Sequence, residues 1–344
     1  MTIQESIAKL IEGQDLTRTE TMAAMNQIMS GDATPAQIGA YLVALRMKGE
    51  TVDEITGSTR AMRAHAVRVT PADSIAPLLD IVGTGGDGSH SFNISTTAAF
   101  VIAATGRRVA KHGNRAASSK CGSADVLEAA GVSMDLTPEQ VATCIDTIGI
   151  GFMFAPRFHP AMKHAIGPRR ELKQRTIFNI LGPLTNPAGA THQLTGVYDP
   201  ALTEPLARVL GELGSKAAMV IHSHDGLDEL TTTGPNRVSQ LQPDGSVHSF
   251  DLHPEELGLG NSNQERMTGG SAEENLELMR GVLGGKMGGV RKDTVLLNAA
   301  ATIATENGDM RTALQEARAA LESGTALKKL EALVDSSQQL SAHQ

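Results

Sequence analysis

Apolar positions recur every three or four residues through two stretches near the start of the chain, 22–29 and 38–45, and this spacing places them on one face of a helix. Each predicted helix begins at a capping box, in which a threonine is followed three residues later by Glu or Gln. The boxes are Thr17 with Glu20, Thr34 with Gln37, and Thr51 with Glu54. Gly31 and Gly49 fall where helices end. We therefore expect a small N-terminal unit built of helices.

From Pro77 onward the pattern changes, because short apolar runs begin to alternate with helical segments. Strands are predicted at residues 78–82, 109–111, 132–136, 151–154, 193–198 and 217–222, with helices at 95–104, 123–130, 137–148 and 203–213. Alternation of this kind is typical of a parallel sheet covered by helices on both faces. Residues 238–242 and 246–252 flank Pro243-Asp244-Gly245, which predicts a hairpin added antiparallel at the sheet edge. The C-terminal third is mostly helical.

The fold class is therefore α/β, with a small N-terminal helical domain over residues 1–72 and a larger α/β domain over 73–344. In the larger domain a mainly parallel central sheet is flanked by helices. The net charge of -8 and the lack of a basic run argue against a partner such as nucleic acid or an anionic membrane. Two cysteines, no signal-peptide pattern and no long apolar stretch lead us to expect a cytoplasmic protein.

A glycine-rich loop follows the first predicted strand. Residues 83–88 read GTGGDG and precede a helix, a place where free backbone N–H groups and the helix dipole favour an anion. The pattern is neither a Walker loop nor the dinucleotide GxGxxG motif. Taken alone, it fits a plain strand-to-helix turn equally well. Residues 91–97, SFNISTT, carry hydroxyl and amide groups that suit either helix capping or the binding of diphosphate oxygens and a metal ion.

Cations and hydroxyl groups gather after the second predicted strand. Residues 111–115 read KHGNR, and Ser118, Ser119 and Lys120 follow. Because ligands of parallel α/β sheets bind outside the carboxyl ends of the strands, we expect an anion site here. A solvated basic loop is the alternative, and it is the better interpretation of Lys120 taken alone.

An acidic pair follows the predicted strand at 217–222. In residues 225–230, DGLDEL, Asp228 and Glu229 can both face one site if they lie on a loop, as adjacent residues on a helix cannot. Mg²⁺ prefers oxygen ligands and is usually held by one or two carboxylates together with substrate phosphates. An isolated Asp-Glu pair is most often a solvated turn, but here the other loops offer phosphates for a metal ion to bridge.

These segments occur in the order and spacing of the anthranilate phosphoribosyltransferase family, and the chain resembles a full-length member. The matching stretches are GTGGDGSHSFNIST from Gly83, KHGNRAASSKCGSADVLEAAG from Lys111, FAPRFHPAMKHAIGPRRELKQRTIFNILGPLTNP from Phe154 and HSHDGLDEL from His222. Related nucleoside phosphorylases share the fold and a version of the first loop. The segments KHGNR and RTIFNILGPLTNP together are specific to the family.

The resemblance implies an activity and a set of site residues. The enzyme would join the amine of anthranilate to the ribose of 5-phosphoribosyl 1-diphosphate (PRPP), with loss of pyrophosphate, as the second step of tryptophan biosynthesis from chorismate. Anthranilate would contact Gly83, Asn114 and Arg169. Two Mg²⁺ ions would bind, one at Ser95 and Glu229 and one at Asp228 and Glu229. PRPP would be held by Gly83, Gly86, Asp87, Ser91, Asn93, Ile94, Ser95, Thr96, Lys111, His112, Gly113, Asn114, Arg115, Ala116, Ala117, Ser118, Ser119 and Ser123.

The resemblance also implies an architecture. Helices from about residues 159–190 would join the N-terminal helices, the two domains would face each other across a cleft, and the molecule would be a homodimer through the helical domain. Charge alone does not single out Arg169, since Arg170, Lys173 and Arg175 lie close to it in sequence. A guanidinium group is nevertheless the best match for a carboxylate.

Displacement at the anomeric carbon requires no protein nucleophile, so the Ser and His residues are interpreted as ligands and positioning groups. His112 is one candidate acceptor for the amine proton, and the carboxylate of the substrate is another. A nucleoside phosphorylase, an enzyme with another aromatic acceptor and a nucleic-acid binder are the alternatives. The KHGNR segment and Arg169 argue against a phosphorylase, and the acidic charge with an intact Asp228-Glu229 pair argues against a nucleic-acid binder.

Overall fold

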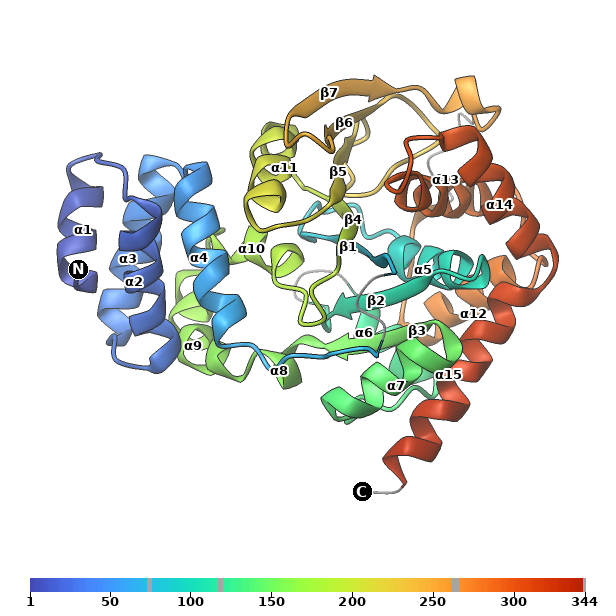
Figure 1. Ribbon diagram of the computed structural model, residues 1–344, viewed down its shortest axis with the longest axis horizontal. Helices are drawn as coiled ribbons and strands as arrows, with labels where there is room; N and C mark the ends of the chain where they lie inside the picture. The colour runs from blue at the N-terminus through green and yellow to red at the C-terminus, as the bar shows by residue number, and fades with distance from the viewer. Residues whose placement is uncertain (73–75, 117–119, 261–266, 343–344) are drawn as a thin grey trace.

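The computed structural model describes residues 1–72, 76–116, 120–260 and 267–342 (Figure 1). The chain begins with a bundle of α1 (Ile3–Ile11), α2 (Arg18–Ser30), α3 (Pro35–Lys48) and α4 (Val52–Ala64). The three predicted capping boxes are confirmed at the starts of α2, α3 and α4. The sequence analysis missed α1, although it begins at the same kind of box, formed by Thr2 and Glu5.

A second set of helical segments lies beside this bundle, as Figure 1 shows in green next to blue. They are α8 (Ala155–Phe158), η1 (Pro160–Met162), α9 (Lys163–Leu172), α10 (Phe178–Leu181) and η2 (Gly182–Leu184). Ala165, Ile177 and Leu181 are buried in one apolar cluster with Ile28 and Leu42 of the bundle. The segment after His159 therefore packs against the N-terminal bundle.

The described residues of the larger part form a seven-stranded sheet in the order β3-β2-β1-β4-β5-β6-β7. The strands are β1 (Leu78–Gly83), β2 (Arg108–Gly113), β3 (Ile150–Phe154), β4 (His192–Gly196), β5 (Ala217–Ser223), β6 (Asn236–Leu241) and β7 (Val247–Leu252). The first five in sequence are parallel, and the β6–β7 hairpin adds antiparallel to β5. The predicted α/β class and edge hairpin are thus confirmed.

Both faces of the sheet are buried by helices. On β5, Met219 and Ile221 belong to the cluster that includes the C-terminal helices, whereas Ala218 and Val220 belong to the cluster that includes α11 and the helical bundle. Neighbouring residues of a strand point to opposite faces, so β5 separates two cores. The covering helices are α5 (Ile94–Ala104), α6 (Ser123–Ala130), α7 (Pro138–Ile148), α11 (Thr203–Glu212), α12 (Ala272–Leu283), α13 (Val290–Ala304), α14 (Met310–Glu322) and α15 (Thr325–Ser341), with short turns η3 (Pro200–Leu202) and η4 (Pro254–Leu257).

One predicted strand, residues 132–136, is wrong, because this segment is a loop between α6 and α7. Val132 and Leu136 are buried in the main core, which explains the apolar pattern. The backbone N–H of Ser133 donates to the Ser337 hydroxyl instead of pairing with a strand. The position next to β2 is taken by β3.

Three segments connect the helical and α/β parts, and backbone hydrogen bonds tie them together. The N–H of Val67, after α4, donates to the carbonyl of Phe158 at 2.9 Å, and the N–H of Val69 donates to that of Pro187 at 3.2 Å. The connections therefore run side by side. Within the described residues, no helix is both long enough and apolar enough to span a membrane.

Candidate active site

A cavity of about 750 Å³ lies at the carboxyl ends of the parallel strands, between the sheet and the helical part. It is lined by Gly83 at the end of β1, Gly113 at the end of β2, and Met62, Ile166 and Phe178 from the helical segments. All of the predicted site residues that the structure describes line this one cavity. Ala117, Ser118 and Ser119 lie outside the described residues. The cavity brings the predicted residues together, and their individual roles stay predictions.

The glycine-rich loop has a backbone conformation that side chains rarely adopt. Gly85, Gly86 and Gly88 have φ angles of +67°, +74° and +76°. Such angles carry no steric cost for glycine, which explains why the loop needs these residues. The N–H of Gly85 donates to Oδ2 of Asp228 at 2.6 Å, so the loop lies against the acidic segment that follows β5.

The polar residues at the start of α5 are not used for capping. Asn93 is the N-cap residue, and its side chain makes no capping hydrogen bond. That side chain instead contacts Cys121 and Asn275. The N–H of Ser95, in the first turn, donates to Oε1 of Glu229 at 3.1 Å. One backbone donor of this helix start therefore meets a carboxylate across the cavity, which is the kind of partner that an anion-binding helix start takes.

Lys111 brings a buried positive charge to the cavity. Only 3% of the residue is exposed, and its Nζ donates to the carbonyl of Ile81 at 2.6 Å. Burial lowers the pKa of the Lys111 amine, while the nearby charge of Asp80 acts in the opposite direction. Burial also raises the pKa of Asp80 to about 6. Lys111 and Asp80 thus influence each other's charge without a direct ion pair in the described part of the chain.

Asp228 and Glu229 lie together with little solvent around them. Burial raises the pKa of Asp228 to about 7, with a further contribution from the charge of Asp87, and the N–H of Asp228 lies 3.4 Å from Oδ2 of Asp87. Burial and the charge of Asp228 raise the pKa of Glu229 to about 8. Crowded carboxylates of this kind gain most from a cation, because it offsets both the desolvation and the mutual repulsion.

This acidic pair fits Mg²⁺ in its chemistry. No cluster of three or more His, Cys, Asp or Glu side chains suited to a metal ion occurs in the described part of the chain. A closed protein cage is therefore absent there, whereas Mg²⁺ is commonly held by one or two carboxylates and completed by substrate phosphates and water. Glu229, at 9% exposure and hydrogen-bonded to Ser95, is placed for such a role.

The basic loop after β2 divides into residues that face the cavity and residues that do not. Lys120 is exposed and does not line the cavity, as its solvated interpretation predicted. Arg115 lines it, but its guanidinium group forms ion pairs with Asp125 and Glu128. The charge of Arg115 is therefore already balanced, and Lys111 is the deeper cation of the two.

The structure resolves which of four neighbouring cations belongs to the site. Arg169 lines the cavity, and Arg170, Lys173 and Arg175 do not. The Arg169 guanidinium lies 5.1 Å from the centre of the Phe178 ring, and burial lowers its pKa. A partly desolvated guanidinium beside an aromatic ring is well suited to an aromatic carboxylate.

Sequence reasoning missed two residues that line the cavity, His159 and Phe178. The imidazole rings of His159 and His112 lie 5.1 Å apart, and Nε2 of each is buried without a hydrogen-bond partner. Burial holds the pKa of His112 well below its ordinary value and lowers that of His159 to about 4, so both rings are neutral. Arg175 stacks on Tyr198 at 4.1 Å and donates to the carbonyl of Gly86. Arg175 thus contacts the glycine-rich loop from outside the cavity lining. The segment that carries His159, Arg169 and Phe178 was singled out from the sequence, but only Arg169 was assigned a role.

The fold and the cavity together define a glycosyl transferase. Residues 75–327 match the model of the α/β domain of the glycosyl transferase family, and residues 4–66 match that of its helical bundle domain. Within this class the chain belongs to the anthranilate phosphoribosyltransferase family. The family member of Moorella thermoacetica is 52% identical over 96% of this chain and 97% of its own length.

Solved structures agree with this assignment. Anthranilate phosphoribosyltransferase from Thermus thermophilus superposes with a TM-score of 0.91 at 43% identity, covering 97% of this chain and 99% of that one. The Saccharomyces cerevisiae enzyme in complex with PRPP and Mg gives a TM-score of 0.89 at 28% identity, with 98% of both chains covered. The same yeast enzyme in complex with 4-fluoroanthranilate gives 0.87 at 27% identity over the same share of each chain. The predicted family is confirmed.

Proposed function

We propose that this enzyme transfers the phosphoribosyl group of PRPP to the amine of anthranilate, giving N-(5-phosphoribosyl)anthranilate and pyrophosphate. One observation carries the proposal. A single cavity joins the glycine-rich loop, the buried Lys111, the acidic pair Asp228-Glu229 and the half-buried Arg169. The glycine-rich loop, Lys111 and the acidic pair with its metal suit a diphosphate ester, and Arg169 suits an aromatic carboxylate.

PRPP would lie across the carboxyl ends of β1 and β2. Its phosphate oxygens would accept hydrogen bonds from the backbone of the loop at Gly83–Asp87 and of the α5 start at Asn93–Thr96, and the charge of Lys111 would lie behind them. The segment after β2, from His112 to Ala116 with Ser123, would enclose the ribose and its phosphate. These groups are held by the sheet before any substrate arrives, so little reorganisation is needed at the moment of reaction.

We propose two Mg²⁺ ions, the first held by Ser95 and Glu229 and the second by Asp228 and Glu229. When bound, the metal neutralises negative charge that develops on the departing diphosphate. The chain contributes the carboxylates and keeps them in place. The Ser95 N–H orients Glu229, and the Gly85 N–H orients Asp228.

Anthranilate would lie on the helical side of the cavity, with its carboxylate on Arg169 and its ring near Phe178. Asn114 and Gly83 would hold the amine close to the anomeric carbon, which makes the attack effectively intramolecular. His112 is a candidate to accept the amine proton because it lines the cavity and its Nε2 has no hydrogen-bond partner among the described residues, although burial lowers its pKa and so makes it a weaker base. The carboxylate of anthranilate is the competing acceptor.

The direct test mixes the purified protein with anthranilate, PRPP and Mg²⁺ and follows the loss of anthranilate fluorescence. The signal should fall only when all three are present. Replacing anthranilate and PRPP by a nucleoside and inorganic phosphate tests the phosphorylase alternative. Nucleoside cleavage without anthranilate consumption would overturn the proposal.

Replacing Arg169 by alanine should weaken anthranilate binding far more than PRPP binding. The change removes the charge partner of the carboxylate. Loss of this charge-assisted hydrogen bond should cost about 1.5 to 3 kcal/mol of binding free energy, which raises the apparent anthranilate constant roughly ten- to a hundredfold. Steady-state kinetics with each substrate varied in turn would measure both constants. Arg170→Ala, which removes an exposed guanidinium outside the cavity, is the matched control. An equal rise in the PRPP constant would contradict the assignment.

The helical and α/β parts of the molecule should close toward each other when both substrates are present. The cavity lies between them, and exclusion of water protects a cationic reaction centre. Small-angle scattering should show a smaller radius of gyration with PRPP, Mg²⁺ and an unreactive anthranilate analogue than with either substrate alone. An unchanged radius would count against closure.

We further propose that residues 1–72, joined by about 159–190, form the helical domain, that residues 73–344 form the α/β domain, and that two copies associate through the helical domain in the cytoplasm. Exposed Ile11 and Met47 on that domain supply apolar surface for such a contact. Cys121 and Cys144 form no disulfide, which agrees with a reducing compartment. Sedimentation of the purified enzyme would report the dimer.

A further inference from the structure

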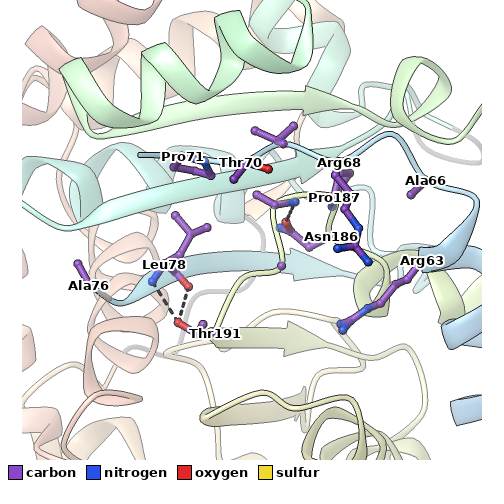
Figure 2. A pocket seen from close by; sticks show the side chains of 13 residues that line it. Arg63, Ala66, Arg68, Thr70, Pro71, Ala76, Leu78, Asn186, Pro187 and Thr191 are labelled. Carbon is purple, nitrogen blue, oxygen red and sulfur yellow. Dashed lines mark hydrogen bonds between the residues drawn. The ribbon is translucent and has the colours of Figure 1, made fainter. Parts of the chain in front are cut away.

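A second cavity, of about 380 Å³, lies away from the candidate active site, where the helical and α/β parts are connected (Figure 2). Its walls come from the end of α4 with the segment after it, from the start of β1, and from the loop at 186–191. Val69 and Pro187, which line it, also form one of the backbone hydrogen bonds that tie the connections together. Its volume lies within the range of small-molecule sites.

Arg63 gives this cavity a guanidinium group with an incomplete set of partners. Its Nε donates to the carbonyl of Leu184 at 2.8 Å, and its Nη1 lies 3.4 Å from that of Leu213. A guanidinium carries five N–H donors, so these two bonds leave most of its capacity unused. Burial lowers the pKa of Arg63 to about 10. Among the described residues, no carboxylate forms an ion pair with it.

Arg68 brings a second guanidinium to the same cavity. It is exposed, and it too forms no ion pair within the described ranges of the chain. Figure 2 shows Arg63 and Arg68 on the same side of the cavity, next to Asn186. The amide of Asn186 is already bonded to Asp80 and Ala110, so it does not compensate the two positive charges. Within the ranges that the structure describes, neither guanidinium group has a carboxylate partner, and two such groups lining one cavity favour an anion between them.

Among the described residues, the opposite side of the cavity is mostly apolar, and the hydroxyl group of Thr191 on that side is already hydrogen-bonded to the backbone of Leu78. Figure 2 places Pro71, Ala76 and Leu78 across from the two arginines. A free phosphate would satisfy the guanidinium groups and leave this wall in contact with water. A ligand with a charged head and an apolar body would use both sides, and burial of its body would contribute binding energy in proportion to the area covered.

We propose that this cavity binds a small monocarboxylate with an apolar body, whose carboxylate lies between Arg63 and Arg68 and whose body covers Leu78. Such a ligand would brace the segment after α4 against the loop at 186–191. It would therefore act on the connection between the two parts of the molecule while leaving the substrate cavity untouched. The binding itself does not depend on the activity proposed above.

The test titrates the full-length protein with phenylacetate by calorimetry and by ligand-observed NMR. Phenylacetamide, which has the same shape and no charge, and inorganic phosphate, which has charge and no apolar body, are titrated in parallel. Arg68→Ala is the main variant because Arg68 is exposed and its loss should not disturb folding. Arg60→Ala is the matched control, since it removes a guanidinium from α4 outside the cavity. Arg169→Ala reports binding at the active site.

Phenylacetate should bind the wild type and the Arg169→Ala variant equally, and Arg68→Ala should weaken it about tenfold, the value of one charge-assisted hydrogen bond. Arg60→Ala should stay within about twofold of the wild type. The transferase rate of Arg68→Ala without phenylacetate should be unchanged.

Equal affinity of Arg68→Ala and the wild type would overturn the proposal. So would loss of binding in Arg169→Ala, which would place phenylacetate in the active site. If phenylacetamide bound as tightly as phenylacetate, the proposed contact between the carboxylate and the arginines would be wrong. If phosphate bound more tightly than phenylacetate, the proposed contribution of the apolar wall would be wrong.

Discussion

Replacing Glu229 by glutamine is expected to lower the turnover number by about a hundredfold or more, because the departing diphosphate then loses part of its charge neutralisation. Glu229 is buried, lies beside Asp228 and accepts a hydrogen bond from the Ser95 N–H. Glutamine keeps the size and an oxygen that can accept that bond. The fold should therefore survive, and the loss should be confined to metal binding and turnover.

Asp228→Asn should be less damaging, because Glu229 is proposed to touch both metal ions and Asp228 only one. Mg²⁺ gives up water reluctantly and depends on anionic ligands to offset that cost. PRPP should still bind both variants through the glycine-rich loop and Lys111. Initial rates over a magnesium titration would measure the effect, with circular dichroism to check folding.

The matched control is Asp225→Asn, in the same loop. Asp225 accepts hydrogen bonds from the hydroxyl groups of Thr231 and Thr233 and does not line the cavity. This variant should keep the magnesium optimum of the wild type. Near-normal rates of Glu229→Gln at that optimum would mean that the metal is held elsewhere, and the roles proposed for the acidic pair would have to be abandoned.

Replacing Gly196 by alanine is the second change with a large expected effect. Gly196 ends β4 in the middle of the sheet, and a Cβ there would overlap the carbonyl oxygen and the carbonyl carbon of Asp228. Both atoms are backbone, so no side chain can rotate away. The segment carrying Asp228 and Glu229 must move, which should cost about 1 to 3 kcal/mol of stability and at least tenfold in turnover.

Denaturant unfolding and kcat of the Gly196→Ala variant would measure these losses. Gly288→Ala is the control, because Gly288 is exposed and a Cβ there meets no atom within 4 Å. It should unfold at the same denaturant concentration as the wild type. A Gly196→Ala enzyme with unchanged stability and kcat would show that the acidic segment tolerates displacement.

Short sequence motifs predicted a helix or strand correctly where the contacts that form it lie between residues close in sequence. The capping boxes at Thr17, Thr34 and Thr51 lie within one turn of the helices they begin, and all three helices were found. The strand prediction for residues 132–136 was wrong because a run of apolar residues indicates burial only. A strand also needs a neighbouring strand whose backbone donors and acceptors are still unpaired, and the run does not show that. That partner is set by the sheet, in which β3 already occupies the edge next to β2.

The side of the candidate site formed by the sheet was predicted better than the side formed by the helices. Loops that follow strands could be placed at one edge of the sheet from their order alone, so the glycine-rich loop, Lys111 and the acidic pair were found together. The helical side was harder, because the choice of Arg169 over Arg175 depends on how α9 packs, which no local pattern reports. His159 was missed because its relation to His112 exists only after the chain returns to the bundle.

The hydrogen bonds from Gly85 and Ser95 to the acidic pair have a consequence for how the substrates bind. These two backbone donors are of the kind that a diphosphate requires, so the protein's own carboxylates compete with PRPP for them. A cation bound to Asp228 and Glu229 would take up part of their negative charge and so weaken their hold on these two donors, which would raise the affinity for PRPP. By thermodynamic reciprocity, bound PRPP raises the affinity for the cation by the same factor. If Mg²⁺ is that cation, the apparent PRPP constant of the enzyme should fall as the free magnesium concentration rises.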